Sequence, residues 1–182
     1  MLNPSDKYEK RETVSFPSLK NDVYQAQLLD VVKKEGKAYQ SEETEMNFSF
    51  EFAILNGKDA DGGSARLRLL NKNFVPTYLY ISQKNGKNWL YKITEAFLGR
   101  ELNQAEEAEG ITGEMLNSFI GKQCRVVLEK KASKKDASKF YSNISNILPA
   151  DDLLEPLTDV DMANINEQKA KKDLDDNKNL PF

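Results

Sequence analysis

The chain has 182 residues, of which 30% are charged and 39% hydrophobic, and its formal net charge is -3. It contains no histidine and one cysteine, Cys124, which excludes imidazole-based catalysis, Ser-His and Cys-His nucleophile pairs, intrachain disulfides and thiolate zinc cages. The first residues contain no apolar stretch like that of a secretory leader, and no apolar run reaches membrane-spanning length, so we expect a cytoplasmic protein that makes no use of a membrane.

The first half of the chain predicts a flexible arm followed by three strands. Residues 1–20 are polar, and Pro17 interrupts any regular start. Residues 23–33 are rich in β-branched and apolar side chains. Residues 44–55 alternate most clearly, with one face formed by Met46, Phe48, Phe50, Phe52 and Ile54. After the turn-rich segment 56–63, residues 64–70 alternate again, and we expect the three strands to form a meander.

The second half changes from helical to strand periodicity. The apolar residues of 89–98 recur at helical spacing, with Gly99 placed to end the helix. A shorter helix is predicted in 111–121, with Thr112 as N-cap and Gly121 as the stop. Strands are predicted at 122–130 and 139–148. The order β-β-β-α-β-β predicts a mainly β domain over residues 21–149: an OB-fold, a five-stranded Greek-key barrel with a helical insertion between strands three and four. Other five-stranded small barrels stay open.

The last segment, residues 150–182, has a different composition. It carries nine acidic residues against four lysines, whereas residues 1–149 carry 22 basic and 20 acidic residues. Its hydrophobicity is low and no strand pattern is present, so we expect an acidic and mostly disordered segment, with a short helix around 160–172 as an alternative. A slightly basic body with an acidic tail is typical of nucleic-acid binders whose tails contact proteins.

Lysines gather in the two loops that flank the ligand groove of an OB-fold. The loop after the first strand has Lys33, Lys34 and Lys37, and the loop between the last two strands has Lys130, Lys131, Lys134, Lys135 and Lys139. Single-stranded nucleic acid needs cations along its phosphates, and the release of counterions supplies much of the affinity. Surface loops are also commonly rich in lysine, but the shared placement of these runs favours binding.

Further candidate contacts come from arginines and aromatic rings. Arg66 and Arg68 are two residues apart on a predicted strand, so their side chains would share its outer face. They could bind phosphates there, or they could simply be solvated and paired with Glu51. Aromatic rings act as stacking platforms for bases. Four tyrosines lie near the predicted groove: Tyr39, Tyr78, Tyr80 and Tyr141. The Phe48–Phe50–Phe52 stripe and Trp89 are typical of a core instead.

No catalytic or metal-binding pattern is complete in this sequence, and we expect neither an enzyme nor a cofactor. Glu129-Lys130-Lys131 matches part of a metal-dependent nuclease pattern but lacks an upstream acid on a strand. Residues 59–63 resemble a calcium loop without its full ligand series. We interpret both partial matches as chance occurrences.

The last ten residues, DLDDNKNLPF, resemble the C-terminal tip of bacterial and phage single-stranded DNA-binding proteins. The matching positions are Asp175, Asp176, Leu180, Pro181 and Phe182, with Asp173 extending the acidic run. The resemblance implies that this tip recruits replication, recombination and repair proteins and competes with DNA for the basic groove. Lys178 departs from the unbroken acidic run of the family, which would weaken electrostatic steering. Residues 74–102, 119–131 and 141–150 loosely resemble small phage-encoded replication proteins, and we expect a bacterial or phage-infected cytoplasm.

These observations predict a protein that coats single-stranded DNA without strong sequence preference and recruits partner proteins through residues 150–182. RNA binding, oligomeric state and origin stay open. The main alternative is an OB-like protein-protein adaptor with a docking tail, and a third is an accessory to a metal-dependent nuclease.

Overall fold

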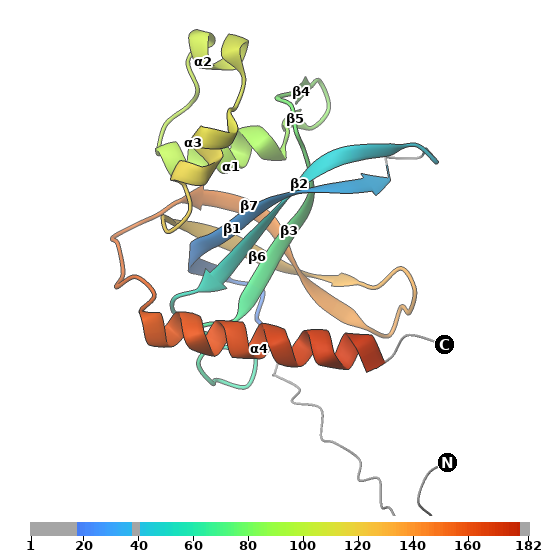
Figure 1. Ribbon diagram of the computed structural model, residues 1–182, viewed down its shortest axis with the longest axis vertical. Helices are drawn as coiled ribbons and strands as arrows, with labels where there is room; N and C mark the ends of the chain where they lie inside the picture. Colours follow the sequence, from blue (N-terminus) through green and yellow to red (C-terminus); the bar gives the residue numbers. More distant parts are fainter. Residues whose placement is uncertain (1–17, 38–40, 179–182) are drawn as a thin grey trace, which may run out of the picture.

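The protein is described by a computed structural model over residues 18–37 and 41–178, with side chains as far as Asp173. Five strands form one antiparallel sheet in the order β3-β2-β1-β6-β7 (Figure 1). Their bounds are β1 (Val23–Lys37), β2 (Thr44–Ile54), β3 (Leu69–Pro76), β6 (Gln123–Ala132) and β7 (Phe140–Pro149). The prediction of a mainly β chain is confirmed.

The inner face of the sheet carries the core that the alternation of residues 44–55 predicts. Phe50, Phe52 and Ile54 are fully buried, so the prediction for the centre of the phenylalanine stripe is confirmed. They pack with side chains of β1 and β6 in one cluster: Tyr24, Ala26, Leu28, Cys124, Val126 and Leu128. Phe48 and Trp89 are only partly buried at its margin.

The third strand begins later than the sequence pattern predicts. Residues 64–68 form a turn in which Leu67 has a φ of 67°, and the Arg68 amide donates to the Ala65 carbonyl. A leucine in the left-handed region cannot continue the alternation of a strand. The predicted strand 64–70 is therefore wrong except for its last two residues, and β3 begins at Leu69.

The connection between β3 and β6 contains more elements than the predicted pair of helices. It comprises the short hairpin β4 (Ile81–Ser82) and β5 (Gly86–Lys87), then α1 (Trp89–Leu98), α2 (Gln104–Glu109) and α3 (Gly113–Ser118). Asn88 caps α1, and Gly99 ends it in the left-handed conformation, as predicted. Thr112 accepts from the Met115 amide and caps α3, as predicted. Helix α1 contacts β3, β6 and β7.

A strap of residues 150–158 leaves β7 and is held along the sheet by glutamines. Gln25 donates to the Asp152 carbonyl, Gln123 exchanges two hydrogen bonds with the Leu154 backbone, and Gln27 accepts from the Leu157 amide. These hydrogen bonds join glutamine side chains of the sheet to backbone groups of the strap. The strap is therefore held in place although its sequence has no apolar periodicity. Its order was not predicted from the sequence.

The expectation that the acidic segment is mostly disordered is wrong for α4 (Asp159–Lys178), and the alternative helix 160–172 is shorter than the real one. Helix α4 lies across the ends of β2 and β3 (Figure 1). Thr158 caps it, Ile165 is fully buried beneath it, and Lys169 forms an ion pair with Glu51 of β2. One apolar anchor and polar contacts order this helix despite its low hydrophobicity. No helix in the described ranges is both long and apolar enough to cross a membrane.

The five-stranded sheet is coiled but open. Register shifts interrupt the ladders between β1 and β2, β2 and β3, and β6 and β7, and bulges of this kind bend strands. Strands β3 and β7 form the two edges. The edges approach each other closely enough for the Lys72 ammonium to reach the Ile144 carbonyl, with 3.4 Å between Nζ and oxygen. This opening between β3 and β7 positions the site described next.

Candidate nucleic-acid interface

Two long hairpins project beyond the core toward the same side of the molecule (Figure 1). The β1–β2 arm comprises residues 31–50, and the β6–β7 arm comprises residues 129–142. Most side chains of 32–37, 42–46 and 129–141 are exposed. The predicted lysine loops are therefore largely strand: Lys33, Lys34 and Lys37 lie on β1, and Lys130 and Lys131 lie on β6.

The two arms differ in charge, which the predicted pair of basic loops does not anticipate. The β1–β2 arm has three lysines and four glutamates, and Lys37 forms an ion pair with Glu42. The β6–β7 arm has five lysines and two acidic residues, with one ion pair between Lys139 and Asp136. Lys130, Lys131, Lys134 and Lys135 form no ion pair with any described residue. The basic arm is thus β6–β7.

The two predicted arginine contacts are turned toward the chain itself. Arg66 donates to the Leu55 carbonyl at 3.1 Å and forms an ion pair with Asp161 of α4 at 2.8 Å. Arg68 lies 3.9 Å from the buried Asp59, and desolvation lowers the pKa of its guanidinium. Because both residues precede β3, they do not share an outer strand face. Their engagement in the fold argues against the predicted phosphate clamp.

Exposed aromatic rings gather around the basic arm and the β3 edge. Tyr141 pairs with Lys131 across the arm, and the neighbouring Phe140 is 65% exposed. Phe74 of β3 is 69% exposed, since its φ of 58° at the register shift turns it out of the strand pattern. Tyr78 and Tyr80 are exposed, and their carbonyls accept hydrogen bonds from Asn88 beside α1. The predicted contact Tyr39 lies outside the described residues.

Sequence reasoning missed Phe74 and Phe140. Phe140 could have been found from its place beside Tyr141 and the lysine run, because both rings of a pair at an exposed hairpin end can stack on bases. Phe74 carried no such signal: the alternation of Leu70 and Lys72 assigns it to the inner face, and only the bulge turns it outward. Phe140 lies beside Tyr141 on the basic arm, whereas Phe74 lies against Gly36 of the β1–β2 arm.

Three lysines converge at the opening between β3 and β7, a group we call the lysine cluster: Lys72, Lys92 and Lys131. The Lys72 ammonium lies 3.7 Å from the centre of the Trp89 ring, and the Lys92 ammonium lies 5.2 Å from the same ring. Lys131 is close enough to repel Lys72 electrostatically. None of the three forms an ion pair within the described part of the chain.

The lysine cluster is electrostatically unfavourable as it stands. Desolvation, followed by repulsion from Lys131 and Lys92, lowers the pKa of Lys72 from 10.5 to about 8. Each cation–π contact with Trp89 offsets about 0.5–2 kcal/mol of this unfavourable free energy. The Ile144 carbonyl accepts one long hydrogen bond from Lys72. The cluster therefore favours a negatively charged ligand.

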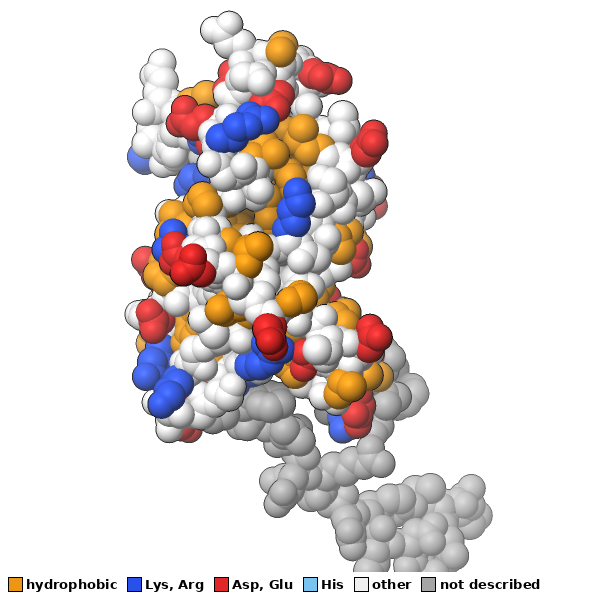
Figure 2. Space-filling model, turned by 90° about the vertical axis from the view of Figure 1, so that its left-hand side faces the viewer, with side chains coloured by type: hydrophobic (Ala, Val, Ile, Leu, Met, Phe, Trp, Pro, Cys, Tyr) orange, Lys and Arg blue, Asp and Glu red, His pale blue; other side chains and the backbone are white. Residues whose placement is uncertain are grey.

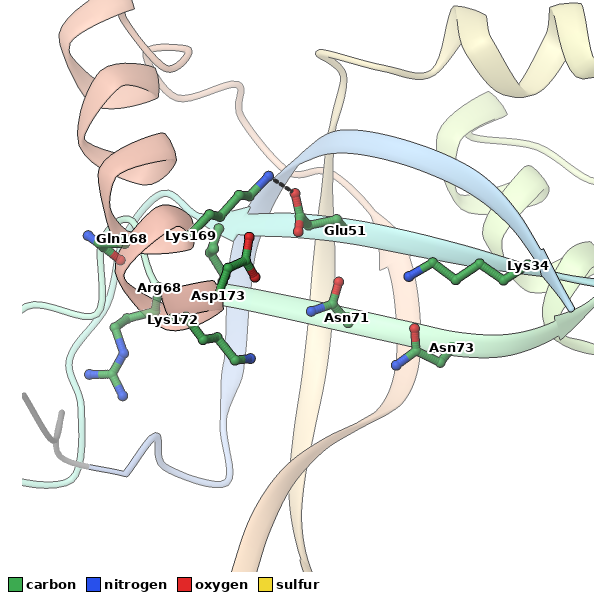
Figure 3. A pocket seen from close by; sticks show the side chains of 10 residues that line it. Lys34, Glu51, Arg68, Asn71, Asn73, Gln168, Lys169, Lys172 and Asp173 are labelled. Atoms are coloured by element: carbon green, nitrogen blue, oxygen red, sulfur yellow. Dashed lines mark hydrogen bonds and ion pairs between the residues drawn. The ribbon is translucent and has the colours of Figure 1, made fainter. Parts of the chain in front are cut away.

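Helix α4 covers part of the outer face of β2 and β3 and borders a half-open polar pocket of about 550 Å³ (Figure 3). Asn71 and Asn73 point into the pocket from β3, and Lys34 reaches it from β1. Lys172 and Asp173 line it from α4. Lys72 alternates with the two asparagines and points to the inner face instead. The outer face of β2 and β3 is thus partly occupied by the chain itself.

The predicted partner-binding residues lie at the end of this helix. Asp173 is exposed, whereas Asp175 and Asp176 lie on α4 without described side chains. Leu180, Pro181 and Phe182 lie outside the described residues.

An apolar groove of about 700 Å³ lies on another face, between the end of α1 and the strap. It is lined by Phe97, Leu98, Leu153, Leu154 and Pro156, with Lys122 at its margin. Figure 2 views the molecule from the side of the strap and shows hydrophobic side chains at the surface of this face. The sequence pattern did not reveal this groove, because the strap was expected to be disordered.

No protein-family model matches the chain, and no match was found among characterised protein sequences. In the parts that the structure describes, no group of three or more cysteine, aspartate or glutamate side chains is arranged to hold a metal ion. The geometry described above therefore carries the functional reasoning by itself.

Proposed function

We propose that the protein binds single-stranded nucleic acid, with single-stranded DNA as the expected ligand, and has no catalytic step. The observation that carries the proposal is the β6–β7 arm, where unpaired lysines and exposed aromatic rings share one hairpin beside the lysine cluster. Cations along a strand neutralise phosphates, and each base stacked on a ring contributes about 1–3 kcal/mol. Contacts of these two kinds do not distinguish one base sequence from another.

We infer an OB-like barrel for the sheet. The order β3-β2-β1-β6-β7, the coiling at three bulges and the helices between β3 and β6 support it, since the OB-fold is a partly open five-stranded barrel. In such a barrel the two arms correspond to the loops that flank the ligand. Most of the described side chains at the ends of both arms are exposed, so they are accessible to a strand.

The direct test is fluorescence polarisation with 5′-labelled oligo-dT at 50 and 200 mM salt. The double variant Lys134→Ala/Lys135→Ala removes up to two phosphate contacts, so the slope of log K against log salt should become less negative by about 1.4. Lys58→Ala/Lys122→Ala is the matched control, since it removes the same charge from exposed positions outside the arm. An arm variant that binds with the wild-type affinity and slope would remove the arm from the interface.

We further propose that the acidic end of the chain recruits replication, recombination and repair proteins. The support is the resemblance of residues 173–182 to the tip of single-stranded DNA-binding proteins. Deletion of Leu180–Phe182 should leave oligo-dT affinity equal or slightly higher and abolish capture of such partners. A large fall in DNA affinity on this deletion would contradict the division of labour.

A protein-protein adaptor is the second candidate, and the apolar groove between α1 and the strap favours it. Exposed apolar grooves commonly mark interaction sites. The same titration separates the two functions: failure of the wild-type protein to bind oligo-dT at 50 mM salt would favour the adaptor.

A further inference from the structure

We propose that the lysine cluster is a phosphate-binding subsite, in which one phosphate group sits between Lys72, Lys92 and Lys131 above the Trp89 ring. The subsite lies at the opening between the edge strands β3 and β7, on the inner side of β3. It is distinct from the outer face of β2 and β3 that α4 covers. Its link to a nucleic-acid strand rests on the proposed function, whereas its affinity for phosphate does not.

The geometry brings two cations to one indole ring, and a third cation lies within electrostatic range of the first. Lys72 comes from β3, Lys92 from α1 and Lys131 from β6. The ammonium groups of Lys72 and Lys92 both lie against the single indole, and are therefore no more than about 9 Å apart. Flexible lysine side chains on either side of one anion can close on it from this separation.

The protons of Lys72 leave room for an anionic acceptor. An ammonium group has three donors. One donor reaches the Ile144 carbonyl at 3.4 Å, a long hydrogen bond, and the indole face takes up part of the remaining charge. A phosphate oxygen would supply a charge-assisted hydrogen bond, which is shorter and about twice as strong as a neutral one.

A phosphate fits the cluster better than a carboxylate does. A carboxylate carries one charge on two oxygens in one plane, whereas a free phosphate carries up to two charges on tetrahedrally placed oxygens, and a backbone phosphodiester carries one charge with the same tetrahedral geometry. Lys131 itself belongs to the basic arm, so a strand bound at the cluster would continue along that arm. Phosphate is the shared chemistry, and its source is either the backbone of a strand or a free phosphate.

Trp89 is the only tryptophan in the chain, so its fluorescence reports on this site alone. The experiment titrates the full chain at pH 7 with sodium pyrophosphate in one arm and with unlabelled oligo-dT in the other. Lys72→Met keeps the length of the side chain and removes the charge. Lys122→Met is the matched control, because Lys122 lies beside the apolar groove, outside the cluster.

We expect both ligands to change Trp89 fluorescence in the wild type and in Lys122→Met, and Lys72→Met to bind pyrophosphate at least tenfold more weakly. Pyrophosphate affinity should also fall between pH 7 and pH 9, because Lys72 loses its proton near pH 8. A response to pyrophosphate without oligo-dT binding would support the subsite and overturn the proposed function. A different pair of results would overturn the subsite and leave the proposed function standing. In that case oligo-dT binds by polarisation without changing Trp89 fluorescence, and Lys72→Met binds both ligands with the wild-type affinity.

Discussion

Replacing Lys72 by methionine should stabilise the folded protein at neutral pH. Folding lowers the pKa of Lys72 from 10.5 to about 8, which corresponds to a cost of ~3 kcal/mol for keeping the charge. The contact with Trp89 stabilises the same charge by ~0.5–2 kcal/mol, and this contact is lost in the variant. We therefore expect Lys72→Met to raise the free energy of unfolding by about 1–2 kcal/mol at pH 7.

The pH dependence gives a second check on the same residue. Since the folded-state pKa lies below the unfolded-state value, the unfolded chain holds the proton more tightly between pH 8 and 10.5, and Lys72 makes stability rise with pH across this window. Burial raises the pKa of the Cys124 thiol, which makes stability fall over part of the same range. The difference between variant and wild type at each pH isolates Lys72, because Cys124 contributes equally to both.

The measurement is urea unfolding followed by circular dichroism at pH 7 and pH 9.5. The stability gap should shrink by about 2 kcal/mol between pH 7 and pH 9.5 and so nearly vanish, since most of the wild-type penalty is already relieved at the higher pH. A variant that is less stable than the wild type at pH 7, or a gap that does not change with pH, would show that Lys72 is not a strained cation. The same result would weaken the case for a phosphate beside it.

Three further perturbations test the packing of the fold. Gly57→Ala should destabilise the protein by about 1–3 kcal/mol, because the φ of Gly57 is 95° and the new Cβ would lie 2.7 Å from the Tyr24 ring. The control Gly62→Ala has a φ of 84° but open space around the new Cβ, and should cost about 1 kcal/mol. Equal melting temperatures of the two variants would refute the clash. Ile165→Ala should speed hydrogen exchange throughout α4 and leave β1 protected, and unchanged α4 exchange would show that this side chain is not the anchor. Lys169→Ala should reduce the salt dependence of the same exchange, because the Lys169–Glu51 pair is lost while the Arg66–Asp161 pair remains; a salt dependence equal to that of the wild type would show that the lost pair does not hold the helix.

The strand alternation was readable in the sequence where one face of a strand is buried throughout. Residues 44–54 show it, because Phe50 and Phe52 must point into the same core. The caps Asn88 and Thr112 and the stop at Gly99 are local hydrogen-bonding effects, and of these Thr112 and Gly99 were predicted. Local chemistry of this kind depends on neighbours in sequence, so a single sequence contains it.

Contacts between distant residues could not be read in this way. The composition of the acidic segment favours disorder, but Glu51 and Arg66 elsewhere in the chain supply partners for α4. The lysine cluster joins three separate elements, and no spacing in the sequence relates Lys72 to Lys131. The outward turn of Phe74 depends on a bulge that forms only when β2 and β3 pair. Each of these features is a property of the tertiary arrangement.

The glutamine-held strap has a consequence for how the chain can change over evolutionary time. Gln25, Gln27 and Gln123 recognise only main-chain carbonyl and amide groups of residues 152–157, which every amino acid except proline offers alike. Substitutions at positions 152–157 can therefore accumulate without removing these hydrogen bonds, whereas the side chain of Asp151 at the start of the strap is needed for its ion pair with Arg125. During evolution the terminal helix could be replaced by another segment while the same hydrogen bonds attach the strap to β1 and β6. The protein would then acquire new binding partners without a change in the sheet.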